Sequence, residues 1–238
     1  MAERELIYDG NEKQVFATDD PSQVIIRFKD IASAFHNVKT AVFPRKGIVN
    51  NRISGILMRS LSEGGIYTHF IDFVDSRSQL CRRSSFLPLE IVVHNYIAGS
   101  LADRLAIEEG TKPSTVIYDL NYRNSSLGDP MINDSQAIAL GFVNEKELAE
   151  IYSIGRRVNE ILLSLFTRIG IRLVDFRLEL GRDSDGKLMI IDEISPDTCR
   201  FWDEETGQRL DKDRFRHDLG NIMPSYDEVL SRLMTITQ

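Results

Sequence analysis

The sequence predicts an α+β fold in which two lobes meet near residue 85. Short strand patterns fill most of residues 1–85, whereas residues 86–238 mix strand patterns with longer helical ones. Turn signals between the strands and the helical spacing of apolar residues are the two observations behind this division. A ligand site is expected in the cleft between the lobes, where such sites most often form.

Five short strands and one helix are expected in the first part. Gly10 and the run 19–21 supply turns between the first strands. The helix covers 46–64, carries an apolar stripe and ends at a pair of glycines. Near its start, Asn50 and Asn51 either face an anion or lie on the helix surface. The expected strands are 6–8, 14–17, 23–28, 66–75 and 79–83.

In the second part we expect a strand at 88–97 and helices at 104–109, 145–169 and 225–234. Asn144 and Glu147 form a capping-box pattern at the start of the long helix, and Gly170 closes it. Its aliphatic residues recur at helical spacing, so we assign them to the core and not to a ligand site.

An acidic hairpin at 173–202 is the most informative stretch of the chain. Alternation along its first strand places Asp175, Arg177 and Glu179 on one face, and aliphatic residues from Val174 onward on the other. After a turn, an apolar strand returns and ends at Asp192. If the strands pair, Glu179 and Asp192 share one cleft, where their repulsion calls for a partner such as Mg²⁺. The alternative is a surface hairpin with solvated charges.

The composition is that of an ordinary globular enzyme, with 238 residues, 42% of them hydrophobic and 27% charged. A net charge of −7 argues against nucleic acid as a partner, because binding a phosphate backbone needs a basic face. Two cysteines give no disulfide framework and indicate a reduced, cytoplasmic setting. No signal-peptide pattern and no apolar run of transmembrane length is present, so we expect no membrane partner.

Several single residues allow two interpretations each. Lys13 follows a glycine turn, and it either covers nucleotide phosphates or is a solvated hairpin residue. His94 is either a ligand or a structural residue, and the step that ends at Ser100 can hold a phosphate. Arg200 and Arg216 either clamp a phosphate with their guanidinium groups or belong to a solvated charge run.

Taken together, these blocks resemble the phosphoribosylaminoimidazole-succinocarboxamide synthase (SAICAR synthetase) family from Tyr8 to Leu233. The most specific matches are VDFRLELG at 174–181 and DEISPDTCRFWD at 192–203. Supporting matches are THF at 68–70, NYIAGSL at 95–101, IEEG at 107–110, GDPMIN at 128–133 and LDKDRFR at 210–216.

The resemblance implies a two-lobe fold related to ATP-grasp enzymes, with a mainly antiparallel N-terminal sheet. Residues 1–85 would cover the nucleotide, and residues 86–238 would carry the metal and substrate site. In the implied reaction, ATP phosphorylates the carboxylate of carboxyaminoimidazole ribotide, and the amine of L-aspartate then displaces phosphate to form an amide. A homodimer is also implied.

By resemblance, the candidate site residues fall into three groups. The ligands of Mg²⁺ and ATP would be Glu179 and Asp192, with Lys13 and Arg123 as further nucleotide contacts. The ligands of the ribotide phosphate would be His94, Ser100, Arg200 and Arg216. The residues facing the reacting carboxylate would be Asp175 and Arg177.

Several of these positions depart from the family pattern. Asn11 stands where the family has the first lysine of its phosphate-binding turn, and Arg123 and Arg177 stand in place of lysines. The segment 33–37 lacks the family's glycine. His94 is the most consequential change, because it replaces a permanent guanidinium fork with a shorter group that can be neutral at pH 7. One lost charge-assisted contact costs about 1.5–3 kcal/mol.

Three functions therefore fit the sequence. The first is the succinocarboxamide-forming ligase with its usual substrates. The second is a ligase on the same scaffold that uses another carboxylate or amine. The third is a non-catalytic protein that binds a nucleotide or a ribotide, which acid-dependent release of ADP would exclude.

Overall fold

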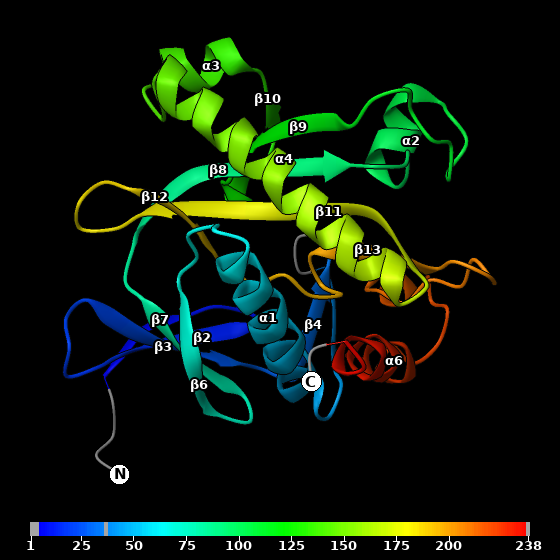
Figure 1. Ribbon diagram of the computed structural model, residues 1–238, viewed down its shortest axis with the longest axis horizontal. Helices are drawn as coiled ribbons and strands as arrows, with labels where there is room; N and C mark the ends of the chain where they lie inside the picture. The colour runs from blue at the N-terminus through cyan, green and yellow to red at the C-terminus, as the bar shows by residue number, and fades with distance from the viewer. Residues whose placement is uncertain (1–4, 36–37, 237–238) are drawn as a thin grey trace.

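The computed structural model describes residues 5–35 and 38–236 and contains two larger antiparallel sheets and a two-stranded hairpin (Figure 1). The main hydrophobic core connects the two larger sheets. It joins Ile53 and Leu57, from the helix packed on the first sheet, to Leu89 and Phe176 of the second sheet. Among the described residues, no helix is long and apolar enough to cross a membrane. Cys81 and Cys199 are buried and free.

The first sheet has the strand order β1-β2-β3-β7-β6, and each neighbouring pair is antiparallel. The antiparallel sheet implied by the resemblance is thus confirmed. Helix α1 (Lys46–Glu63) packs against β3, β6 and β7. The strands are β1 (Leu6–Asp9), β2 (Lys13–Ala17), β3 (Gln23–Phe28), β6 (Phe70–Asp75) and β7 (Ser78–Arg82).

A hairpin of β4 (Ile31–Ala34) and β5 (Lys39–Val42) lies between β3 and α1 in the chain. It has no counterpart among the expected strands. Alanine and serine make up most of β4, and small residues of this kind give no strand signal.

The second sheet has the order β10-β9-β8-β11-β12, and β13 also pairs with β11. Within it Glu179 lies opposite Ile191, so Asp192 follows directly at the end of β12 and the predicted pairing of the acidic hairpin is confirmed. The strands are β8 (Ser85–His94), β9 (Ile117–Tyr122), β10 (Met131–Ile132), β11 (Ile171–Arg182), β12 (Leu188–Ile191) and β13 (Cys199–Asp203).

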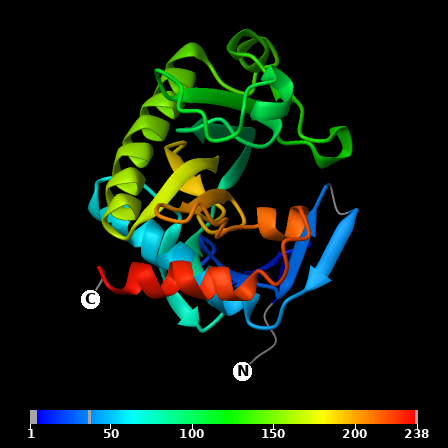
Figure 2. The same ribbon diagram turned by 90° about the vertical axis from the view of Figure 1, so that its right-hand side faces the viewer.

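Helix α4 (Glu145–Arg168) crosses one face of this sheet, over β8 and β11 (Figures 1 and 2). The predicted capping box at Asn144 is confirmed, with both of its hydrogen bonds formed. Gly155 allows the close approach, since a Cβ there would lie 3.2 Å from Ile91 Cδ1. The shorter helical elements are α2 (Ser100–Leu105), the 3₁₀ turn η1 (Ser125–Leu127), α3 (Asp134–Ala139), α5 (Asp213–Arg216) and α6 (Met223–Met234).

Two local expectations are wrong. The short helix is α2 (Ser100–Leu105), which stops before Ala106, where φ is 52°. Glu109 is not helical and instead accepts a hydrogen bond from the backbone N–H of Gly99 at 2.7 Å. Val174 does not share the core face of β11, because the register with β13 shifts there and Val174 packs in a separate small cluster with Trp202.

Candidate active site

The face of the second sheet opposite α4 carries the charged residues. Register places His94 of β8 and Arg200 of β13 opposite Asp175 of β11. Glu179 lies four residues further along β11 and points to the same side, because side chains alternate along a strand. Ile91 points to the other side, under α4. The polar alternation expected for β11 is therefore present and lies on one continuous face.

One end of this face brings together four of the predicted residues. Lys13 of β2 forms an ion pair with Asp192 and lies 2.7 Å from Glu193 Oε1. The Nε of Arg123 donates to Glu179 Oε1 at 2.8 Å. Two cations thus reach the paired strand ends, one from each sheet, and this end is suited to the phosphates of a nucleotide.

The electrostatics of the two acids favour a bound cation. Burial, followed by the nearby charge of Asp192, raises the pKa of Glu179 to about 7. Burial would also raise the pKa of Asp192, but the ion pair with Lys13 outweighs it and lowers the pKa. Asp192 adopts the left-handed φ of 64°, which is uncommon outside glycine and typical of functional sites. Two carboxylates that repel each other, Glu179 within β11 and Asp192 just after the paired end of β12, fit the oxygen ligands that Mg²⁺ prefers.

At the other end of the face, Arg200 is bound by two carboxylates, one on each side. The Nε of Arg200 donates to Asp213 Oδ2 and its Nη1 donates to Asp175 Oδ2, both at 2.7 Å. Asp213 also pairs with Arg216. A Cβ at Gly99 would lie only 2.2 Å from Arg200 Nη2, so the backbone leading to Ser100 rests on the guanidinium group. The residues expected to hold a phosphate therefore lie together.

His94 lies on this face beside the arginine. Its Nδ1 is 3.4 Å from Asp175 Oδ2 and its Nε2 is 3.4 Å from Asp119 Oδ2. The His94 side chain is buried, as expected for a structural residue, but it touches two carboxylates of the candidate site. The burial agrees with the structural interpretation, and a role as a ligand stays a prediction.

Arg177 lies between the two ends. It sits midway along β11 between Asp175 and Glu179, which are about 13 Å apart at strand spacing. Its guanidinium group is partly exposed and lies 3.9 Å from Glu90 Oε1. Asp175, in contrast, is buried and faces Arg200 and His94. Of the two residues expected to face a reacting carboxylate, only Arg177 is open to one.

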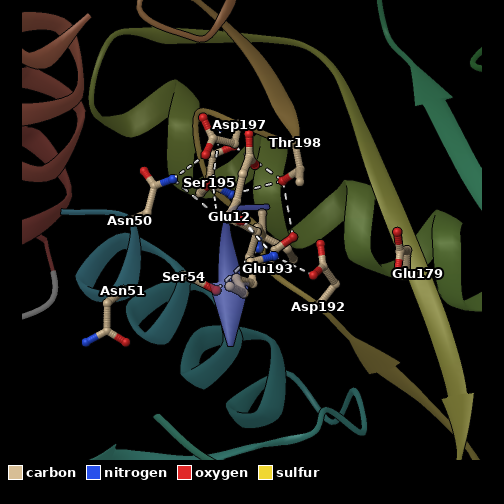
Figure 3. A network of polar contacts seen from close by, with 12 residues as sticks. Glu12, Asn50, Asn51, Ser54, Glu179, Asp192, Glu193, Ser195, Asp197 and Thr198 are labelled. Atoms are coloured by element: carbon tan, nitrogen blue, oxygen red, sulfur yellow. Dashed lines mark hydrogen bonds and ion pairs between the residues drawn. The ribbon is translucent and has the colours of Figure 1, made fainter. Parts of the chain in front are cut away.

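A buried network that the sequence does not reveal connects α1 to the loop after β12 (Figure 3). Lys46 forms an ion pair with Asp197, and Asn50 Nδ2 donates to Asp197 Oδ2 at 2.6 Å. Tyr226 of α6 donates to the other carboxylate oxygen at 2.7 Å. Lys46 and Asn50 lie at helical spacing from Ile53, on the same side as the apolar stripe. This spacing was the only sequence feature that could have indicated their burial. Asn50 and Asn51 are buried, and neither lies on the helix surface.

Three acids of this region, Glu12, Glu193 and Asp197, have carboxylate oxygens within 4.8 Å of one another. Each already has a lysine partner: Lys212 Nζ lies 2.6 Å from Glu12, Lys13 pairs with Glu193, and Asp197 pairs with Lys46. Figure 3 shows Glu179 apart from this group, on β11. The three acids thus have lysine partners, just as Asp192 has Lys13 and Glu179 has Arg123.

Comparisons with known proteins identify the family of this chain. A family model described as SAICAR synthetase matches residues 6–233. The phosphoribosylaminoimidazole-succinocarboxamide synthase of Fusobacterium nucleatum is 48% identical over 233 residues, which cover 98% of each chain. The crystal structure of phosphoribosylaminoimidazole-succinocarboxamide synthase from Ehrlichia chaffeensis matches with a TM-score of 0.95 at 43% identity, over 98% of this chain and 99% of that one.

A solved SAICAR synthetase (Type-2) in complex with ADP matches with a TM-score of 0.93 at 43% identity, over 96% of this chain and 97% of that one. Sequence and structure thus agree over nearly the full length of these relatives and of this chain. The chain belongs to the SAICAR synthetase family.

Proposed function

We propose that the protein is an ATP-dependent ligase that joins the carboxylate of carboxyaminoimidazole ribotide to L-aspartate, with SAICAR, ADP and phosphate as products. One observation carries the proposal. A single sheet face has an acid pair with two cations at one end and an arginine held by two acids at the other. That arrangement suits a nucleotide triphosphate and a phosphorylated substrate whose reacting groups meet between them.

At the nucleotide end, Glu179 and Asp192 would hold Mg²⁺, and Lys13 and Arg123 would contact the phosphates. Bound there, Mg²⁺ would neutralise phosphate charge and align the nucleotide. When the phosphates arrive, Lys13 exchanges part of its interaction with Asp192 for a phosphate oxygen. The chain's own contribution is a set of fixed charges that needs little rearrangement during transfer.

At the substrate end, Arg200, Arg216 and Ser100 would hold the ribotide phosphate, with His94 beside them behind Asp175. Arg200 is oriented in advance by its two carboxylate partners, so a phosphate would meet a guanidinium group with free N–H groups in a fixed direction. We propose that Asp175 contributes by orienting this arginine. Anchoring the phosphate places the far end of the ribotide near Arg177.

Arg177 would then lie beside the carboxylate that reacts. A guanidinium group there would bind and orient the carboxylate while an oxygen of that carboxylate attacks the γ-phosphorus of ATP and ADP leaves. The amine of aspartate next attacks the carboxyl carbon, the C–O bond breaks, and phosphate leaves with the oxygen that carried it. The amine loses a proton in this step, and the net products are an amide, ADP and phosphate.

The wider arrangement follows from the same proposal. Residues 1–85 would cover the nucleotide and residues 86–238 would carry the metal and the substrates. We also propose a homodimer and a cytoplasmic setting, where the free cysteines Cys81 and Cys199 stay reduced.

The test is ADP release by the purified protein with Mg²⁺, ATP, the ribotide and L-aspartate, each omitted in turn. Release that needs all of them, together with a product of the mass of the succinocarboxamide, supports the proposal. Binding of Mg²⁺–ADP without any acid-dependent release of ADP would contradict it and favour a binding protein.

A second candidate is a ligase for another carboxylate, favoured by the departures at His94 and Arg177, both of which lie on the site face. Release of ADP with a different acid, at a higher kcat/KM than with the ribotide, would select it. Under this candidate, His94→Arg should not raise turnover of that acid, because no ribose phosphate needs the restored charge.

A further inference from the structure

His94 is held between two carboxylates that approach opposite nitrogens of its ring. Nδ1 faces Asp175 of β11 and Nε2 faces Asp119 of β9, each at 3.4 Å. Only 4% of the histidine is exposed, and Asp175 is buried beside it. Neither acid can turn away into solvent without giving up its arginine partner, since Arg104 Nη2 donates to Asp119 at 2.8 Å and Arg200 donates to Asp175.

These contacts form a row of alternating charges across the sheet face. In spatial order the groups are Arg104, Asp119, His94, Asp175, Arg200, Asp213 and Arg216. Every member but His94 has a fixed charge at neutral pH. With a neutral histidine the row holds three arginines and three acids, and Arg209, which also lies 3.7 Å from Asp213, is itself paired with Glu109. With a protonated histidine the row gains one positive charge beside Arg200.

The ring geometry itself favours the proton. A neutral imidazole has one N–H and one lone pair, so one of the two carboxylates would face a lone pair. An imidazolium has an N–H toward each acid; neither nitrogen forms a hydrogen bond at 3.4 Å, but the positive charge of the ring attracts both carboxylates. Burial lowers the pKa of His94, but the contacts with Asp119 and Asp175 outweigh it and raise the pKa above the ordinary value. Among the residues that the structure describes, the charged groups that face the ring directly or through one acid are Asp119, Asp175, Arg104 and Arg200.

We propose that His94 is a positioning residue whose imidazolium form holds Asp175, and through it Arg200, in the conformation that binds a phosphate monoester. Affinity for the phosphorylated substrate then depends on one proton on this ring. The identity of that substrate rests on the proposed function, while the protonation of the ring does not. The charge of a histidine at this position depends on pH, whereas an arginine would always be charged.

The kinetic test compares wild type, His94→Gln and His94→Arg from about pH 6 to about pH 9, a range that spans histidine titration. With saturating ATP and aspartate, we expect the wild-type KM for the ribotide to rise about tenfold or more as the ring loses its proton. The glutamine variant should have the high KM throughout, and the arginine variant the low KM throughout. The value of kcat should change less, because the ring does not touch the reacting atoms.

His217→Gln is the matched control, since His217 is exposed and lies outside the row of charges. It should keep the wild-type dependence of KM on pH. If His94→Gln also keeps that dependence, or if His94→Arg shows it, the proposal is overturned. A low KM in His94→Arg together with a high KM in His94→Gln would show that the charge at position 94, and not the shape of the side chain, sets the affinity.

A second readout needs no turnover. NMR of protein labelled in its histidine rings, with the His94 signal assigned from His94→Gln, should give a His94 pKa above about 6.5 that rises further when inorganic phosphate is added. A His94 pKa at or below that value would overturn the proposal. If wild type releases no ADP at any pH, the proposed function fails instead, and the NMR titration still decides the state of the ring.

Discussion

Replacing Glu179 by glutamine should weaken Mg²⁺-dependent binding of ADP and, at the same time, raise the stability of the metal-free protein. The substitution removes a negative charge from the proposed cation site but keeps an oxygen that can accept from Arg123, which also lies 2.7 Å from Asp129. We therefore expect Mg²⁺-dependent binding of ADP to be lost. The metal-free protein, in contrast, should become more stable, because the substitution removes the cost of burying a charged carboxylate and, second, its repulsion by Asp192.

The size of the stability change follows from the pKa of Glu179, which the fold raises from 4.5 to about 7. At 1.36 kcal/mol for each pH unit, a shift of this kind is worth about 1–3 kcal/mol near neutral pH. The folded state holds this proton more tightly than the unfolded state. The free energy of unfolding therefore falls as the pH rises from about 4.5 to about 7, and the variant should lack this part of the slope.

The assay is urea unfolding in the presence of a chelator, together with ADP titrations with and without Mg²⁺. Asp185→Asn is the matched control, because it removes one acid from the exposed turn of the same hairpin and leaves the site face untouched. A Glu179→Gln protein that binds Mg²⁺–ADP as wild type does, or that is less stable than wild type without metal, would refute the reasoning.

Three further substitutions test other parts of the structure. Lys46→Met leaves a buried carboxylate without its cation and should cost about 3–5 kcal/mol in urea unfolding, whereas Lys39→Met, at a partly exposed pair, should cost less than about 1 kcal/mol. Gly99→Ala should raise the KM for the ribotide about tenfold by displacing the arginine beside it, while Gly186→Ala, which has a positive φ but no neighbour within 4 Å, should lower stability alone. His94 should stabilise the fold fully below about pH 6.5 and lose this contribution as the pH rises through its raised pKa, a slope that thermal unfolding of His94→Gln should lack.

Local patterns were enough to predict much of this fold. Alternation along β11 identified the polar face with Asp175, Arg177 and Glu179, and the turn after it identified the partner strand. Capping at Asn144 and the apolar period after it fixed the start of α4. These features depend on residues close in sequence, which a single chain displays directly.

Contacts between distant segments were not predictable in this way. Lys46 and Asp197 are 151 positions apart, and nothing near either one shows that they meet. The bulge at Val174 arises where β11 must pair with β13 as well as β8, so its cause lies on another strand. From the sequence, His94 was a group that can be neutral at pH 7, but two acids on neighbouring strands raise its pKa and favour the charged form.

The most direct test of the account is an isotope experiment on the reaction itself. The ribotide is prepared with ¹⁸O in its carboxylate and turned over with ATP and L-aspartate, and the released phosphate is analysed by mass spectrometry. If ATP activates the carboxylate, one labelled oxygen leaves with each phosphate and the amide keeps the other. Phosphate that contains no ¹⁸O, released alongside the amide, would contradict the proposed route.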